Sequence, residues 1–158
     1  MIKVTDNFLE EDLIKFLENY TLNLPHYWGH TSNADNYAKF YASNLSFQDP
    51  LIQYLLFKIQ KLIKNKLIFL RSYINVHYSN MPGDWHMDDG DQTILLMVSK
   101  TLQKKSGLFE IKENNKIKKF NFIQNRLIFF PAKYQHKGNA PIEHKTPRIT
   151  LVFKTKFN

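Results

Sequence analysis

Two histidines and one aspartate have the residue types and spacing of a metal site. His86 and Asp88 stand two positions apart, and His136 follows much later in the chain. Because residues i and i+2 of a β-strand point to the same face, His86 and Asp88 can reach one ion. Two imidazoles and one carboxylate, with coordination positions left open, suit non-haem Fe(II). The sequence therefore predicts an iron site made by these three residues.

Arg148 and Thr150 form a second polar group on the last predicted strand. Alternation puts both on one face of that strand and puts Ile149 and Leu151 on the other. A buried arginine needs a partner, and its guanidinium can give a carboxylate two charge-assisted hydrogen bonds that lysine cannot match. We therefore expect an anion-binding pair close to the metal.

The N-terminus should begin with a strand and a helix. Residues 2–5 predict a short strand, and Asp6 or Asn7 can cap a helix whose apolar positions keep helical spacing to about Tyr20. The periodicity then disappears over residues 21–46.

Residues 21–46 predict a long loop, with a short strand near residues 37–41 as an alternative for part of it. Loops of this length are often functional. His26, Trp28 and His30 are accordingly candidates for a lid over the site, and otherwise ordinary loop residues.

The chain changes from helical to strand patterns after a second predicted helix. Asp49 followed by Pro50 indicates the start of that helix, which should run to about Lys64. Short β-branched and aromatic runs then follow one another without helices between them, which favours an antiparallel sandwich or barrel. These runs cover residues 68–78, 93–99, 107–111, 117–123, 127–131 and 147–156.

The expected architecture is mostly β with flanking helices, in a single domain over residues 1–158. Residues 1–66 should provide the helical support and loop, and residues 67–158 the β core. Lysines crowd residues 112–119, which we interpret as a solvated hairpin.

The bulk composition limits the function classes. The 158 residues carry a formal net charge of +8 and no cysteine, which excludes disulfides and thiolate metal sites and favours acidic partners. The sequence has neither a signal-peptide pattern nor an apolar run near the roughly 20 residues of a membrane span. We expect a soluble cytoplasmic protein (host cytoplasm if it is phage-encoded) without a membrane partner.

Taken in order, several stretches resemble the Fe(II)/2-oxoglutarate-dependent oxygenases, particularly the prolyl-4-hydroxylase-like branch and small oxygenases of the phage type. The resemblance covers roughly residues 68–156. The matching stretches are residues 71–75, 85–89, 106–109 and 125–130, His136, and residues 148–151.

The resemblance implies a double-stranded β-helix, a jelly-roll or cupin-like barrel, with N-terminal helices packed on one sheet. It makes His86, Asp88 and His136 the ligands of Fe(II), with dioxygen as cosubstrate. Arg148 would pair with the distal carboxylate of 2-oxoglutarate, and Thr150 would add a hydroxyl to the same carboxylate.

The strand before the metal ligands should contact the metal-side end of 2-oxoglutarate. Asn75, His77 and Tyr78 are the candidates. Strict alternation puts Asn75 and His77 on one face and Tyr78 on the other, and a bulge would be needed to bring both Asn75 and Tyr78 inward. We rank Asn75 and Tyr78 above His77.

The sequence departs from the family pattern in three places. Met97 and Ser99 stand where the family often has Tyr and Asn, so a second contact to 2-oxoglutarate is in doubt. The usual Gly-Gly is Ser106-Gly107. A longer segment between His136 and Arg148 leaves His144 as a rival third ligand. We favour His136, since it directly follows a strand and its turn, whereas His144 lies in an expected loop tip.

The predicted reaction is hydroxylation of a substrate C–H bond with release of succinate and CO2. Related halogenases have a small residue in place of the carboxylate ligand, so Asp88 favours hydroxylation. The first candidate substrate is a prolyl or other amino-acid side chain of a peptide. Trp85 and Tyr73 could line its pocket, although such aromatics are more often core residues.

Two alternatives remain at this point. The +8 charge is compatible with a nucleic-acid oxidative demethylase. Such relatives usually carry a second site arginine downstream of the first, where this chain has only Lys154 and Lys156. The other alternative is a non-catalytic β-barrel binding module that has lost turnover.

Overall fold

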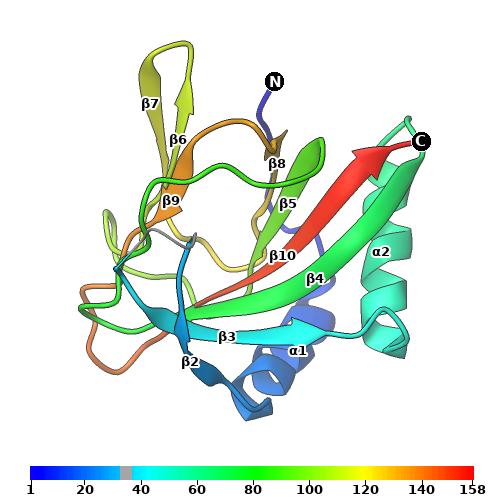
Figure 1. The fold of residues 1–158 in the computed structure, drawn as a ribbon. Helices are drawn as coiled ribbons and strands as arrows, with labels where there is room; N and C mark the ends of the chain where they lie inside the picture. Colours follow the sequence, from blue (N-terminus) through cyan, green and yellow to red (C-terminus); the bar gives the residue numbers. More distant parts are fainter. Residues whose placement is uncertain (33–36) are drawn as a thin grey trace.

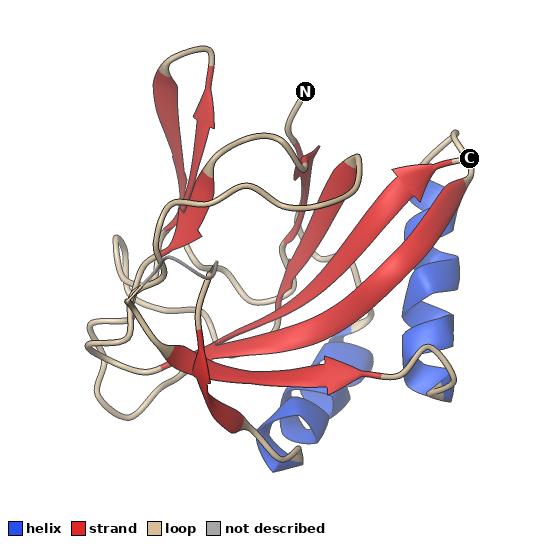
Figure 2. Cartoon of the chain, viewed as in Figure 1, coloured by secondary structure: helices blue, strands red, loops and turns tan. Residues whose placement is uncertain are grey.

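The protein is built mainly from antiparallel β-sheets (Figures 1 and 2). The computed structural model describes residues 1–32 and 37–158, and these residues contain two helices and ten strands. The expected mostly β class is therefore confirmed. The strands form one large and one small sheet.

The large sheet holds the long central strands. Its order is β1-β8-β5-β10-β4-β3-β2, and all its pairs are antiparallel. The strands are β1 (Lys3–Thr5), β2 (Tyr27–His30), β3 (Phe40–Leu45), β4 (Leu67–His77), β5 (Gln92–Met97), β8 (Leu127–Pro131) and β10 (Arg148–Phe157).

The small sheet has the order β7-β6-β9 and covers part of the other face. Its strands are β6 (Phe109–Glu113), β7 (Lys116–Phe120) and β9 (His136–Gly138). Asn114 and Asn115 form the β6–β7 turn with φ of 50° and 60°, as asparagine tolerates in tight hairpins. The lysine-rich hairpin is confirmed, and most of β7 is exposed.

Both helices pack on one side of the large sheet (Figure 2). They are α1 (Glu11–Asn23) and α2 (Pro50–Leu62). Asp49 caps α2, since its Oδ1 accepts a hydrogen bond of 2.8 Å from the Leu51 amide, as the Asp-Pro signal predicts. Fully buried side chains from both helices, among them Leu17 of α1 and Leu55 of α2, join the sheet in one apolar core.

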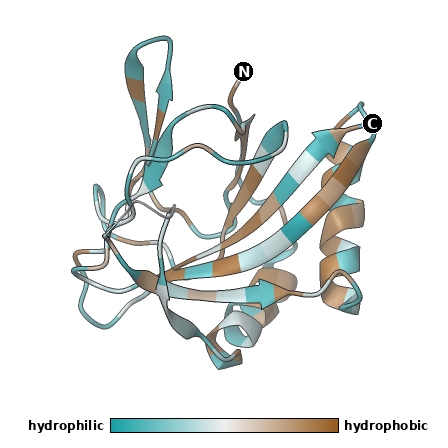
Figure 3. Cartoon of the chain, in the orientation of Figure 1, coloured by the Kyte–Doolittle hydropathy of each residue, from teal (hydrophilic) through white to brown (hydrophobic). Residues whose placement is uncertain are grey.

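Strand β10 separates this apolar core from a polar interior. Ile149, Leu151 and Phe153 pack in the helix-side core, whereas Arg148 and Thr150 point to the opposite side, where a cavity lies. The alternation of polar and apolar residues along β4 and β10 is visible in Figure 3. The large sheet is thus a wall with a helix-covered face and a site-bearing face.

The first helix begins later than predicted. It starts at Glu11 rather than just after Asp6 or Asn7, and it ends at Asn23 rather than Tyr20. Asn125 explains the late start: its side chain accepts a 2.8 Å hydrogen bond from the Leu9 amide and donates a 2.7 Å hydrogen bond to the Leu9 carbonyl. This long-range contact occupies the Leu9 carbonyl, which in a helix would accept from the amide four residues later, and it also gives the Leu9 amide a partner.

The long loop predicted over residues 21–46 is wrong in part. The segment contains β2 and β3, and β3 pairs with β4 in the large sheet. Residues 33–36 of the segment, and any lid role for them, lie outside the described residues. Neither helix in the described part of the chain is long and apolar enough to span a membrane.

Candidate functional site

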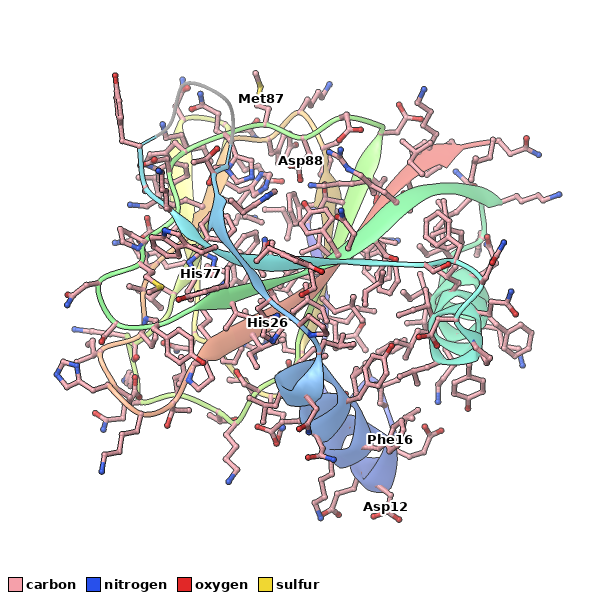
Figure 4. The ribbon with its side chains drawn as sticks, turned by 60° about the horizontal axis from the view of Figure 1, so that its bottom comes forward. Asp12, Phe16, His26, His77, Met87 and Asp88 are labelled. Atoms are coloured by element: carbon pink, nitrogen blue, oxygen red, sulfur yellow. The ribbon has the colours of Figure 1, made fainter. Side chains whose placement is uncertain are left out.

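A short backbone bridge brings the two histidines together. The His86 amide donates to the His136 carbonyl at 3.1 Å, and the His136 amide donates to the His86 carbonyl at 2.9 Å. The Asp88 amide donates to the Ala132 carbonyl at 2.9 Å and continues this pairing. Figure 4 shows Met87 at the outer edge and Asp88 turned inward, which agrees with the 60% exposure of Met87.

The histidine rings are oriented by backbone carbonyls. The Nδ1 atom of His86 lies 2.9 Å from the Asp84 carbonyl, and Nδ1 of His136 lies 2.8 Å from the Tyr134 carbonyl. A carbonyl accepts only, so each Nδ1 carries a proton, and Nε2 is the ring nitrogen of each histidine that is left to face Asp88. Both Nε2 atoms face Asp88, at 3.5 Å from Oδ1 for His86 and 3.1 Å from Oδ2 for His136.

These three side chains fit a metal ion. One ligand atom from each of His86, Asp88 and His136 lies within 4.8 Å of the others. Burial, followed by the neighbouring His136, lowers the pKa of His86 to about 4, so its ring is neutral at pH 7. Burial alone would raise the pKa of Asp88, but the contacts with His136 and Lys154 outweigh it and hold that pKa below its usual value. The His86 ring and the Asp88 carboxylate are therefore in the protonation states that bind a metal ion.

Arg148 is buried deep in the same interior, with 2% of its surface exposed. Its Nε donates a 3.0 Å hydrogen bond to the Gly107 carbonyl. Gly138 makes room for the guanidinium, because a Cβ at that position would lie 2.9 Å from the arginine Cζ. Burial lowers the pKa of Arg148 only to about 10, so the side chain keeps its charge at neutral pH.

Three buried polar atoms near the metal-ligand group have no hydrogen-bond partner among the described residues. They are Arg148 Nη2, Thr150 Oγ1 and Asn75 Oδ1. Strand register brings them together, since Arg148 pairs with His77 and Thr150 pairs with Asn75 across β10 and β4. Buried polar groups are rarely left unpaired, and this cluster of donors and acceptors therefore fits a polar ligand.

One cavity joins these atoms to the metal-ligand group. It has about 390 Å³ of empty space including its open mouth. Residues of the two central strands, the two histidines and the neighbouring loops line it. The polar and charged side chains that line it include Asn75, His77, His86, Asp88, His136, Arg148, Thr150 and Lys154.

Comparison by sequence with protein-family models and with curated proteins found no match. Comparison of structures did. An oxidoreductase of the 2OG-Fe(II) oxygenase family from Burkholderia pseudomallei aligns with a TM-score of 0.76 and 11% identity, over 98% of this chain and 84% of that chain. A prolyl hydroxylase from Trichoplax adhaerens, in complex with a peptide of hypoxia inducible factor, aligns with a TM-score of 0.76 and 13% identity, over 96% of this chain and 82% of that chain. A viral collagen prolyl hydroxylase from Paramecium Bursaria Chlorella virus-1, in a 2OG complex, aligns with a TM-score of 0.73 and 12% identity, over 98% of this chain and 94% of that chain.

The chain has the fold of the 2OG-Fe(II) oxygenases. The double-stranded β-helix expected from the sequence, with helices packed on one sheet, is confirmed.

The structure separates the three candidates on the strand before the metal-ligand group. Asn75 and His77 line the cavity, whereas Tyr78 lies outside it, beside Tyr41 at a ring distance of 6.1 Å. β4 keeps its alternation through His77 without the bulge that an inward Tyr78 requires, and the ranking of the three as contacts of 2-oxoglutarate stays a prediction. The His77 ring stacks on Phe40 at 4.3 Å, and burial followed by the charge of Arg148 lowers its pKa to about 3.

Other candidates from the sequence take different places in this oxygenase fold. His144 is at the surface, where its Nδ1 lies 3.0 Å from the Ser79 hydroxyl, and it does not join the metal-ligand group. Met97 is buried in the core between the sheets, and Ser99 accepts a 2.9 Å hydrogen bond from the Ile149 amide. Neither lines the cavity.

The aromatic candidates also differ in whether they line the site. Tyr73 lines the site cavity and a second cavity that opens beside it, which His30 also lines. Trp85 lies outside both, between Lys112 and Lys137, whose Nζ atoms are 4.4 and 5.1 Å from its ring centre. Trp28 lines a more open hollow on β2.

Reasoning from the sequence missed one buried residue that contacts the site. Lys154 forms an ion pair with Asp88 Oδ2, and Thr93 donates a 2.6 Å hydrogen bond to the same oxygen. Strand parity could have identified it: Lys154 has the same parity as Arg148 and Thr150, so alternation puts it on the site face.

Proposed function

We propose that the protein is an Fe(II)- and 2-oxoglutarate-dependent dioxygenase that hydroxylates a substrate C–H bond and releases succinate and CO2. The whole chain, residues 1–158, would act as one oxygenase domain. The observation that carries the proposal is the cavity in which a two-His, one-carboxylate group lies beside three buried polar atoms without partners among the described residues.

Each of these residues has a role that its position supports. His86, Asp88 and His136 would hold Fe(II) through Nε2, one carboxylate oxygen and Nε2. The bound iron would supply the activation of dioxygen, with 2-oxoglutarate as the co-reductant. Arg148 and Thr150 would donate hydrogen bonds to the distal carboxylate of 2-oxoglutarate. Asn75 would border its metal-side end, and His77 lies opposite Arg148 at the distal end.

The second cavity is the proposed route for the substrate. It shares Tyr73, Asn75, His86 and Asp88 with the site cavity and continues to the exposed side of β3 and β4. We infer that a prolyl or other amino-acid side chain of a peptide enters here. The similarity in fold to two prolyl hydroxylases, one of them in complex with a peptide, supports this choice.

A nucleic-acid substrate is the weaker alternative. The net charge of +8 favours polyanions, but Lys154, the cation downstream of Arg148 on the site face, is buried against Asp88 and is not free to bind a substrate. A cytoplasmic location stays a prediction.

Turnover measurements test the proposal and its alternatives together. With Fe(II), 2-oxoglutarate and oxygen, we expect succinate formation that rises when proline-containing peptides are added, with a peptide mass increase of one oxygen atom. Single-stranded DNA and RNA are the matched competitors. Stimulation by oligonucleotides alone would replace the peptide assignment, and absence of succinate under all conditions would favour the binding-module alternative. His136→Ala is the control for metal-dependent turnover.

A further inference from the structure

Lys154 is a buried cation directed at one of the three metal-ligating side chains. It lies on β10 opposite Thr93 of β5 and is 1% exposed. Its Nζ forms an ion pair with Asp88 Oδ2 and lies 3.5 Å from Thr93 Oγ1 and 5.6 Å from the Tyr73 ring centre. Asp89, the neighbouring carboxylate, is instead paired with Arg71 at 2.6 Å at the surface.

The two oxygens of Asp88 have different surroundings. Oδ2 receives the Lys154 ammonium and the Thr93 hydroxyl, from two adjacent strands. Oδ1 faces Nε2 of His86. Two donors on one oxygen fix the rotation of the carboxylate, with Oδ1 toward Nε2 of His86 and Oδ2 also 3.1 Å from Nε2 of His136.

We propose that Lys154 is a counter-ion that pairs with Asp88 and fixes its orientation before a metal binds, and that its positive charge lowers the affinity of the site for divalent cations. A buried carboxylate without a partner is strongly destabilising, and the ammonium removes that penalty in the metal-free protein. The same charge repels an incoming divalent ion, because the low-dielectric interior screens the repulsion poorly. Lys154 is thus a positioning residue that acts through Asp88, and the inference rests on the metal site of the proposed function.

Binding of Co(II), followed by its visible absorption and by calorimetry without 2-oxoglutarate or turnover, tests the inference. Lys154→Met keeps the length of the side chain and removes its charge. We expect this variant to bind Co(II) at least ten-fold more tightly than the parent. If Lys154 only supported the geometry of the metal ligands, its loss would weaken Co(II) binding. Equal or weaker binding by Lys154→Met would therefore overturn the proposal.

Lys156→Met is the matched control. Lys156 lies two residues further along the same strand and is exposed, so its loss removes one positive charge without touching Asp88. We expect an unchanged Co(II) dissociation constant. If both variants bound Co(II) more tightly to the same degree, the gain would come from the lower net charge of the protein and not from the contact with Asp88, and this would also contradict the proposal.

A double-variant cycle covers the case in which Lys154→Met folds poorly. Metal-free Lys154→Met should melt about 5 °C or more below the parent, since it leaves the Asp88 charge unpaired. The combination Asp88→Asn with Lys154→Met removes both charges and should recover at least half of that loss. No recovery would mean that Lys154 does not act through Asp88. If the parent fails to bind Co(II), the metal site itself is wrong, and this cycle still decides the Lys154–Asp88 coupling.

Discussion

The two faces of β10 carry opposite kinds of side chain. On one face Ile149, Leu151 and Phe153 pack against the helix-side core with no exposed surface. On the other face Arg148 and Thr150 carry buried polar atoms without partners among the described residues. One strand thus carries both the residues that stabilise the fold and the residues that fit a ligand.

The difference indicates what each face contributes in free energy. Burial of aliphatic side chains stabilises the folded state by about 1.5–3 kcal/mol per side chain. Buried polar atoms without partners cost about 1–3 kcal/mol each. The site face therefore reduces the stability of the ligand-free protein, and a ligand that supplies the missing partners would recover that loss.

The largest expected effect is the loss of metal binding from the site face. His136→Ala removes one of the two imidazoles that face Asp88, and we expect Fe(II) or Co(II) affinity to fall more than 100-fold, as measured by anaerobic calorimetry. His144→Ala is the matched control, because His144 lies at the surface beside Ser79. Loss of metal in the control and its retention in His136→Ala would reverse the choice of third ligand.

The next effect separates ligand binding from stability. Arg148→Met removes the guanidinium beside Gly107 and Gly138, and we expect 2-oxoglutarate affinity to fall about 100-fold, or about 3 kcal/mol. Metal affinity should change little. The metal-free variant should be as stable as the parent or more so, because an apolar side chain replaces a buried charge that has no carboxylate partner among the described residues.

Leu151→Ala on the opposite face is the counterpart of Arg148→Met. We expect it to lower the free energy of unfolding by about 2–5 kcal/mol, from lost burial and a cavity in the core, with 2-oxoglutarate affinity retained. Chemical denaturation and calorimetry on both variants check the contrast. If Arg148→Met destabilised the protein as much as Leu151→Ala and left 2-oxoglutarate binding intact, the division between the two faces would be wrong.

Much of this division could be predicted from local sequence pattern. Alternation along residues 147–156 correctly places Arg148 and Thr150 opposite Ile149 and Leu151. The Asp49-Pro50 signal correctly gives the start of α2. Both are short-range features, in which neighbouring residues determine the backbone geometry and the side of the strand to which each side chain points.

The errors arise where distant segments meet. The late start of α1 depends on Asn125, whose contact with Leu9 joins residues 116 positions apart. The space for the Arg148 guanidinium depends on Gly138, on a different strand. Strand parity alone could have placed Lys154 and His77 on the site face, but their importance depends on Asp88 and on the cavity, which only the assembled sheet reveals.

The smallest expected effect is a pH dependence from His77. Its pKa is about 3 in the folded protein because of burial and the charge of Arg148, against about 6.5 when unfolded. Below pH 6.5 the unfolded chain therefore binds a proton that the folded protein does not, and stability falls as the pH falls from 6.5 towards 3. At pH 5 the loss from this residue is about 2 kcal/mol, at about 1.36 kcal/mol per pH unit.

His77→Phe preserves a ring against Phe40 and removes this titration. Metal-free His77→Phe should lose about 2 kcal/mol less stability than the parent between pH 7 and pH 5, as measured by denaturant unfolding at both values. His144→Phe, which changes a surface ring, should follow the parent. Parallel pH profiles for the parent and His77→Phe would show that the polar face accommodates a charged ring at this position. Only Arg148, Thr150 and the metal-ligand group would then distinguish the polar face of the sheet from the apolar one.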